Sequence, residues 1–312
     1  MDLKEFENYK GITPVPADFD EYWEKALGEM RETERNVEIK EAEIQFNNAK
    51  CYDVYFTGVN GARVYSKLIT PAKIEGKIPV ILVFHGYTGG SGNWFNYLGF
   101  VLNGAAVFAM DCRGQGGKSQ DVGGTIGYTC NGHIIRGVDE KDPHKLLFRD
   151  IFLDTAELAD IAYNMDFTDK DKFYTMGVSQ GGGLSLACAA LDTRVKRTVS
   201  TFPFLSDYKC AYESKGTGFG EIEEYFDRFD GLHEHEDEFF TKLGYIDIKN
   251  LAPRIKADVT MFTALKDTDV PVKTQYAAYN ALKCNKKHYI VPDRGHEDLK
   301  QQDLIAKILF DL

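Results

Sequence analysis

Residues 172–190 read KFYTMGVSQGGGLSLACAA, and the rest of the fold can be worked out from them. An apolar run ends at Met176, the turn Gly177-Val-Ser-Gln-Gly181 follows, and a segment rich in Leu and Ala comes next. This order predicts a buried strand, a tight turn and a helix, the setting in which G-x-S-x-G forms a nucleophile elbow. Glycine is required on both sides because the strained turn leaves no room for side chains. We expect Ser179 to project its hydroxyl at the head of the helix.

Short, almost unbroken apolar runs occur on both sides of this stretch, with helical segments between them. Strands that are apolar on both faces are buried, and their alternation with helices indicates βαβ units and a parallel sheet. The runs are residues 79–84, 105–110, 172–176, 198–202, 258–264 and 288–291. The fold class is therefore α/β, with helices expected on both faces of a mostly parallel central sheet.

The N-terminal part of the chain has a different pattern. In residues 18–35, apolar side chains recur at three- and four-residue intervals, which indicates an amphipathic helix. In residues 38–71 the pattern changes to alternation, and Asn60-Gly61 predicts the turn of a β-hairpin. We expect this region to add a helix and antiparallel strands before the parallel sheet begins.

No repeat, low-complexity tract or linker divides the chain, so residues 1–312 are predicted to form a single domain. Two stretches interrupt the alternation of strands and helices. Residues 131–149 mix glycine, charge and histidine without a clear period, and residues 209–244 are acidic with helical patches. Both are expected to be insertions at the rim of the sheet.

A serine hydroxyl becomes a nucleophile when a base removes its proton, and that base is usually a histidine that a carboxylate orients. In the α/β-hydrolase fold, which contains such an elbow, the acid and then the histidine follow the serine along the chain. Asp267 comes just after one of the apolar runs, and His296 comes after the last of them. Open α/β sheets place their active sites at the carboxyl ends of strands, so both positions fit a triad with Ser179. Asp269 is a rival for the acid.

The oxyanion formed during acyl transfer needs two backbone N–H donors, one directly after the nucleophile and one in the loop after an earlier strand. Gln180 follows the serine and supplies the first. The earlier loop is His85-Gly-Tyr-Thr-Gly-Gly90, after the run 79–84, and Tyr87 is the candidate for the second donor. The alternative is a glycine-rich turn that only connects a strand to a helix.

The composition of the chain limits the kinds of ligand it is expected to bind and its expected location in the cell. Hydrophobic residues make up 43% and charged residues 27% of the chain, as in an ordinary globular protein. A formal net charge of −11 disfavours nucleic acid and anionic membranes and favours a small, neutral substrate. The six cysteines form no C-x-x-C pair and are interpreted as reduced thiols. The start, MDLKEFENYK, does not read as a secretory signal, and no apolar run could span a membrane, so a cytoplasmic location is expected.

Three other patterns are interpreted as unrelated to function. Gly116-Gly-Lys-Ser119 lacks the leading glycine of a phosphate loop, because Cys112 stands at that position. Gly90-Ser-Gly92 has Phe95 in place of the third glycine of a dinucleotide-binding motif. His233-Glu-His-Glu-Asp237 lies in an acidic helical stretch and is interpreted as a solvated face. We therefore expect no cofactor and no required metal.

Taken together, these features resemble the acetyl xylan esterase and cephalosporin-C deacetylase family of carbohydrate esterases. The resemblance extends over nearly the whole chain and rests on motifs that are specific in combination. They are Phe19-Asp-Glu-Tyr-Trp-Glu-Lys25, His85-Gly-Tyr87, Arg113-Gly-Gln115, Gly177-Val-Ser-Gln-Gly-Gly-Gly183, Pro203-Phe-Leu-Ser-Asp207, Ala277-Ala-Tyr-Asn280 and His296-Glu297. The resemblance implies Ser179, Asp267 and His296 as the triad, with Tyr87 and Gln180 as the oxyanion donors.

The same resemblance implies an activity and an assembly. It implies a metal-independent enzyme with a narrow pocket for small acyl groups, and a hexamer to whose contacts residues 131–149 contribute. Two features depart from the family: Val178 stands where a smaller residue is usual, and Lys266-Asp-Thr-Asp-Val270 is more charged than usual. The second departure keeps the choice between Asp267 and Asp269 open.

The function expected from the sequence is that of a serine esterase working through an acyl-enzyme. The family resemblance implies acetylated sugars, xylo-oligosaccharides and cephalosporin C as its substrates. One alternative is a receptor of the same fold that binds a small ligand without turnover, since a fold does not dictate function. Another is a serine peptidase. A complete set of Ser179, Asp267 and His296 favours turnover over binding alone.

Overall fold

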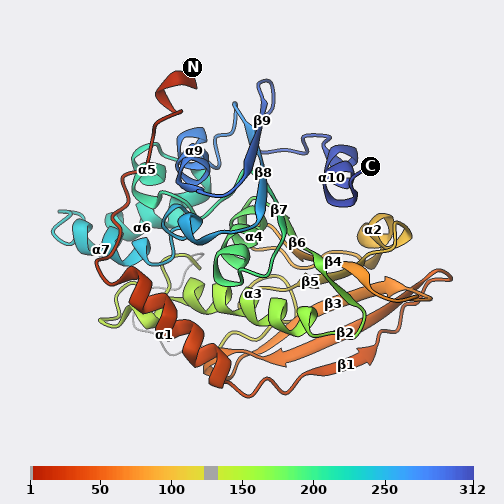
Figure 1. Cartoon of the computed structure of the whole chain (residues 1–312). Coiled ribbons are helices and arrows are strands. Elements are labelled where there is room, and N and C mark those ends of the chain that lie inside the picture. Colours follow the sequence, from red (N-terminus) through yellow and green to blue (C-terminus); the bar gives the residue numbers. More distant parts are fainter. Residues whose placement is uncertain (1–2, 123–132) are drawn as a thin grey trace.

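A computed structural model describes residues 3–122 and 133–312. In these residues nine strands form one sheet in the spatial order β1-β2-β3-β5-β4-β6-β7-β8-β9 (Figure 1). The strands are β1 (Glu38–Glu41), β2 (Ala49–Thr57), β3 (Arg63–Pro71), β4 (Ile78–Phe84), β5 (Ala106–Met110), β6 (Thr168–Val178), β7 (Arg197–Thr201), β8 (Asp258–Ala264) and β9 (Lys286–Val291). The α-helices are α1 (Phe19–Glu32), α2 (Leu98–Leu102), α3 (Leu147–Tyr163), α4 (Gln180–Leu191), α5 (Tyr208–Glu213), α6 (Gly220–Phe229), α7 (Glu236–Gly244), α8 (Ile248–Leu251), α9 (Val272–Ala281) and α10 (Gln302–Phe310).

The N-terminal strands are antiparallel, as their alternating pattern predicted. β2 pairs antiparallel with both β1 and β3, and β3 pairs antiparallel with β5. The hairpin between β2 and β3 turns at Val59–Gly61, where Asn60 has φ of 59°. Asparagine and glycine tolerate this left-handed conformation better than other residues, which is why the Asn-Gly pair marks the turn.

The other six strands, in the spatial order β5-β4-β6-β7-β8-β9, run parallel to one another. The predicted α/β class is therefore confirmed. Two details differ from the prediction. β6 begins at Thr168 rather than residue 172, because its first residues are polar and were invisible to a search for apolar runs. β9 is half-exposed rather than buried on both faces, because it is the edge strand of the sheet.

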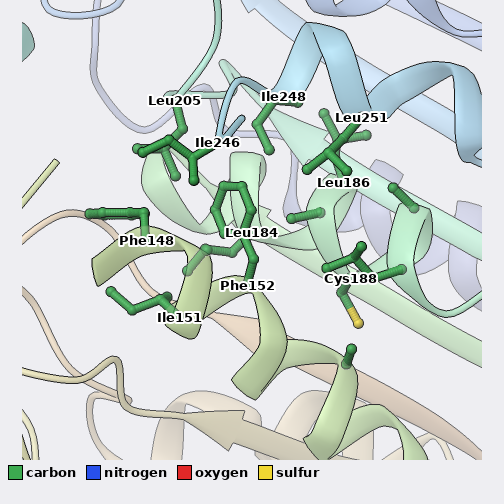
Figure 2. Close-up of a cluster of buried hydrophobic side chains, with 14 of the residues drawn as sticks. Phe148, Ile151, Phe152, Leu184, Leu186, Cys188, Leu205, Ile246, Ile248 and Leu251 are labelled. Atoms are coloured by element: carbon green, nitrogen blue, oxygen red, sulfur yellow. The ribbon is translucent and has the colours of Figure 1, made fainter. Parts of the chain in front are cut away.

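Helices cover both faces of the sheet (Figure 1). Successive residues of β4 point to opposite faces. Val80 and Leu82 belong to the larger of the hydrophobic clusters, which includes residues of α1, α3 and α4, whereas Ile81 belongs to a smaller cluster with residues of α10. On the larger side α3 lies against α4 (Figure 2). Phe148 and Phe152 of α3 are buried there beside apolar residues of α4 and of the segment around α8. This layer holds α4, and therefore the residue at its head, in place.

The described parts of the two predicted rim insertions contact each other, since Lys242 donates to the Val138 carbonyl oxygen at 2.9 Å. Residues 131 and 132 of the first, together with Cys130, are outside the described residues. The remainder runs into α3 at Leu147, so the predicted insertion ended three residues too late, because the first turn of α3 was included in it. The second insertion forms α5, α6 and α7 between β7 and β8. Within residues 3–122 and 133–312, no helix is long and apolar enough to cross a membrane.

Candidate active site

Ser179 lies in the turn between β6 and α4, with φ of 59° and ψ of −121°. An L-residue with a side chain rarely adopts this conformation, so the turn is strained, as a nucleophile elbow is. A Cβ atom at Gly177 would lie 2.1 Å from the carbonyl oxygen of Gly181, and one at Gly181 would lie 2.0 Å from the carbonyl oxygen of Phe84. The crowding predicted around the serine is therefore present, and only glycine fits at both flanking positions.

Backbone hydrogen bonds hold the strained turn in place. The Ser179 N–H donates to the carbonyl oxygen of Thr201 over 3.0 Å. The Ser179 carbonyl oxygen accepts from the N–H groups of Gly183, at 3.1 Å, and Phe204, at 3.0 Å. The end of the neighbouring strand β7 thus compensates for the backbone strain at the serine.

The structure brings Ser179, His296 and Asp267 together in one hydrogen-bonded chain. His296 Nε2 lies 3.0 Å from Ser179 Oγ, and His296 Nδ1 lies 2.9 Å from Asp267 Oδ2. The three residues follow the carboxyl ends of β6, β8 and β9, which converge at one rim of the sheet. Because a carboxylate accepts from Nδ1, the proton of a neutral imidazole belongs on Nδ1, and Nε2 is left to accept from the serine hydroxyl.

The two candidate acids have different surroundings. The Asp267 side chain is fully buried, and its Oδ1 accepts from the N–H groups of Asp269, at 3.0 Å, and Val270, at 2.9 Å. Its Oδ2 also accepts from Gln275 Nε2 at 3.2 Å. These bonds replace the water that an ionised carboxylate loses on burial. The carboxylate of Asp269 accepts instead from the Thr217 hydroxyl, so Asp267 is the acid that faces the imidazole.

The hydroxyl of Ser179 opens into a pocket of about 390 Å³. The pocket is lined by Gly86, Tyr87, Ser179, Phe204, Thr217, Gly218, Asp269, Val270 and His296. Tyr87 is therefore where the sequence placed it, beside the serine. Three of the other lining residues, Phe204, Thr217 and Gly218, come from the loop after β7 and from the insertion that follows it, so this insertion forms one wall.

Gln180, the other predicted oxyanion donor, is completely buried directly behind the serine. Its side-chain amide exchanges two hydrogen bonds with the amide of Gln115, at 2.8 and 3.1 Å, and donates to the His85 carbonyl oxygen at 3.3 Å. The first residue of α4 is thereby tied to both loops that follow β4 and β5. Gln115 belongs to the triplet Arg113-Gly-Gln115, which the family resemblance had marked.

Several residues that contact the site carried no signal in the sequence. The ring of Phe202 packs against the His296 imidazole, with centroids 4.4 Å apart. Gln275 contacts the acid from α9, and Glu221 of α6 accepts a hydrogen bond from the Tyr87 hydroxyl. Only proximity in the folded chain connects these side chains to the site.

The stretch His233–Asp237, interpreted from the sequence as a solvated face, makes contacts within its own segment. In residues 3–122 and 133–312, no group of three or more His, Cys, Asp or Glu side chains is arranged to hold a metal ion. His233 hydrogen-bonds Glu236 at 2.7 Å and stacks on Phe226, with ring centroids 4.5 Å apart. The described cysteines are free thiols, in agreement with the interpretation from the sequence, and burial raises the pKa of Cys112 well above its usual value.

Comparison with known proteins identifies the family. The acetyl xylan esterase (AXE1) model matches residues 1–311. Acetyl xylan esterase 1 from Thermoanaerobacterium sp. JW/SL YS485 is 52% identical, with a TM-score of 0.97 over 100% of this chain and 98% of that one. Acetyl xylan esterase from Paenibacillus sp. R4 is 30% identical, with a TM-score of 0.94 over 100% of this chain and 99% of that one. The resemblance inferred from the sequence is confirmed.

More distant relatives agree with this assignment. Acetyl esterase Axe7A from Xylanibacter ruminicola is 25% identical over 300 residues, which are 92% of this chain and 65% of that protein, so this chain spans about two thirds of its length. Other solved structures, among them an alpha/beta hydrolase, are 14–18% identical with TM-scores of 0.55–0.57 and share the fold alone. The predicted α/β-hydrolase fold is thus confirmed, and the chain belongs to the acetyl xylan esterase family of carboxylic ester hydrolases.

Proposed function

We propose that this chain is a serine esterase that removes acetyl groups from acetylated sugars and xylo-oligosaccharides through an acyl-enzyme. The observation that carries the proposal is the continuous hydrogen-bonded chain Ser179–His296–Asp267 at the pocket of about 390 Å³. The family and the names of its solved members support the acetyl and xylan parts of the proposal.

In the first step the proposed nucleophile is the Oγ atom of Ser179. As Oγ attacks the ester carbonyl carbon, its proton moves to His296 Nε2, and the negative charge that forms on the carbonyl oxygen is stabilised by the N–H groups of Tyr87 and Gln180. The C–O bond to the alcohol then breaks, and His296 returns the proton to the departing alcohol oxygen. Asp267 keeps the imidazole in the right tautomer and stabilises its positive charge.

In the second step water releases the acyl group. His296 Nε2 takes a proton from the water as its oxygen attacks the carbonyl carbon of the acylated Ser179. A second oxyanion forms at the same N–H donors, the bond to Oγ breaks, and the proton returns to the serine. Acetate and free enzyme result, and no metal or cofactor takes part in the proposed sequence.

The proposed preference for small acyl groups rests on the walls of the pocket. Phe204 and Val270 are buried beside Ser179, and a Cβ atom at Gly218 would lie 3.0 Å from the Phe204 ring and 2.9 Å from the Asp269 carbonyl oxygen. So close a packing favours acetyl over longer chains. Cephalosporin C, which also carries an acetyl ester, is included in the proposal as a second substrate.

A panel of substrates tests this function. We expect kcat/KM to be highest for acetyl esters, to fall for butanoyl and octanoyl esters, and to be negligible for a chromogenic peptide amide, because the ratio reports discrimination in the transition state. The Ser179→Ala variant should lose several orders of magnitude of turnover. Near-normal turnover by this variant, or preference for the peptide amide, would contradict the proposal. Binding of the esters without any turnover would identify a receptor instead.

We also propose that the chain forms a hexamer, as its family resemblance implies. Phe229 is 55% and Leu232 is 83% exposed, both at or just after α6. The same helix contacts the first insertion, because the Tyr225 hydroxyl donates to Asp139 at 2.7 Å. Light scattering on the purified chain is expected to give six copies, and a monomer at micromolar concentration would contradict the hexamer.

A further inference from the structure

The hydroxyl of Tyr87 is anchored by residues that are distant from its own loop in the sequence. The hydroxyl donates to Glu221 Oε1 on α6, a residue 134 positions away, and accepts from the His133 N–H at 3.0 Å. The ring packs on Phe204, with centroids 5.4 Å apart, and on His133, at 5.5 Å. The side chain of the proposed oxyanion donor therefore has polar and apolar contacts on several sides.

Glu221 accepts hydrogen bonds from the loop that carries Tyr87 and from the first insertion. Its Oε2 accepts from the N–H groups of Ile134, at 3.1 Å, and Ile135, at 3.3 Å, and its Oε1 accepts from Tyr87. Glu221 is 9% exposed, and within the described residues no ion pair joins it to a cationic side chain. Three donors converge on one buried carboxylate, and they join α6, the first insertion and the loop after β4.

Burial of this carboxylate has an energetic cost. Desolvation raises the pKa of Glu221 to about 7, although its hydrogen bonds to Tyr87 and to the backbone act in the opposite direction. Glu224 on the same helix adds a smaller unfavourable charge, and Tyr208 of α5 lies close enough to be affected by Glu221. An apolar side chain could fill the same space without this desolvation cost. The hydrogen bonds that the carboxylate accepts are therefore what an apolar side chain could not replace.

The loop that carries Tyr87 needs such anchors. It contains Gly86, Gly89 and Gly90, so the free loop has many accessible conformations. Thr88 has φ of 60°, a conformation that a β-branched residue rarely keeps without support from its surroundings. An oxyanion donor is effective only when its N–H already points at the reacting oxygen. At one end the loop is held by His85, whose Nε2 accepts from the Cys112 N–H at 3.0 Å. At the other side the Tyr87 hydroxyl is held by Glu221.

We propose that Glu221 is a positioning residue for ester hydrolysis: its carboxylate holds the Tyr87 side chain and thereby keeps the Tyr87 N–H aimed at the oxyanion. This inference rests on the proposed function and adds to it a residue from the second insertion. It also gives that insertion a role in turnover, beyond forming a wall of the pocket.

A double-mutant cycle with Tyr87→Phe and Glu221→Gln tests the proposal. Each change removes the same charge-assisted hydrogen bond, so each is expected to lower kcat for p-nitrophenyl acetate about tenfold, and the double variant no further. KM should stay within about twofold, because the oxyanion forms only along the reaction path, in acylation and deacylation alike. The matched control is Glu223→Gln on the same helix, an exposed residue paired with Lys215 at 3.1 Å, which should leave kcat unchanged.

The outcomes separate this inference from the function on which it rests. A fall in the unfolding midpoint with normal kcat, or tenfold effects that multiply in the double variant, would overturn the positioning role while leaving the esterase intact. No turnover by the unmodified chain would overturn both. If Glu221→Gln fails to fold, Tyr87→Phe alone decides, because it removes the hydroxyl and leaves the carboxylate with its two backbone donors. A normal kcat in that variant would refute the proposal.

Discussion

Replacing Asp267 by asparagine is expected to remove most of the esterase activity, because of how the surrounding donors orient the new amide. Asp267 Oδ1 accepts from two backbone N–H groups, those of Asp269 and Val270, at 3.0 and 2.9 Å. In the variant these two donors outweigh the single, longer bond from Gln275 Nε2 to Oδ2, at 3.2 Å, and select the orientation in which the amide oxygen faces them. The NH₂ group then faces His296 Nδ1 and donates to it, which moves the imidazole proton to Nε2, where it blocks deprotonation of Ser179.

The magnitude follows from the cost of the opposite orientation. Turning the amide oxygen toward His296 leaves the buried N–H of Val270 and the partly buried N–H of Asp269 without acceptors, at about 1–3 kcal/mol each. Because about 1.4 kcal/mol corresponds to a factor of ten, the fraction of molecules in the competent orientation falls by about 10²–10⁴. We expect kcat for p-nitrophenyl acetate to fall by the same factor, at an unchanged unfolding midpoint within about 3 °C.

The matched variant is Asp269→Asn. Asp269 accepts from the Thr217 hydroxyl, which an asparagine oxygen can also do, so kcat should fall by less than about tenfold. The reasoning would be refuted if Asp267→Asn kept more than a tenth of the activity, or if Asp269→Asn lost as much as Asp267→Asn. Stopped-flow measurement of both acylation and deacylation on both variants provides the comparison.

Two further predictions concern stability. Gly181→Ala should destabilise the fold by at least ~2 kcal/mol, because its Cβ would lie 2.0 Å from the Phe84 carbonyl oxygen. Gly28→Ala in α1 places its Cβ in open space and should stabilise the fold by about 0.5–1 kcal/mol. Urea unfolding measures both free energies, and equal effects would contradict the elbow geometry. Burial lowers the pKa of His288 to about 4, so the unfolded chain takes up a proton at higher pH than the folded chain. Stability contributed by neutral His288 is present above pH 6.5 and lost as the pH falls toward 4, and His288→Phe should flatten the pH dependence of unfolding in that window; an identical dependence in the variant would refute the assignment.

Much of the fold could be predicted because its signals are local. The apolar runs, the glycine turn after Met176 and the Asn60-Gly61 hairpin each depend on a few neighbouring residues, and the structure contains all of them. Element ends were less predictable. The polar start of β6 pairs with β4, and the first turn of α3 falls in a stretch with no clear period, so both were assigned elsewhere.

The candidate site was predictable where chain order constrains it. Ser179, Asp267 and His296 each follow a strand, and a parallel sheet brings such positions to one rim. Glu221 could not be found in this way, because in the sequence it is one acid among many in residues 209–244. Only the packing of α6 against the loop after β4 reveals it. The single-domain organisation, the catalytic roles, the hexamer and the cytoplasmic location stay predictions.

The identity of the nucleophile can be measured directly by trapping the acyl-enzyme. The chain is mixed with p-nitrophenyl acetate, quenched in acid within milliseconds, digested and mapped by mass spectrometry. We expect one acetyl group, located on Ser179, in the unmodified chain and none at that peptide in the Ser179→Ala variant. Acetyl transfer to a different residue, or hydrolysis at an undiminished rate by the variant, would contradict the account.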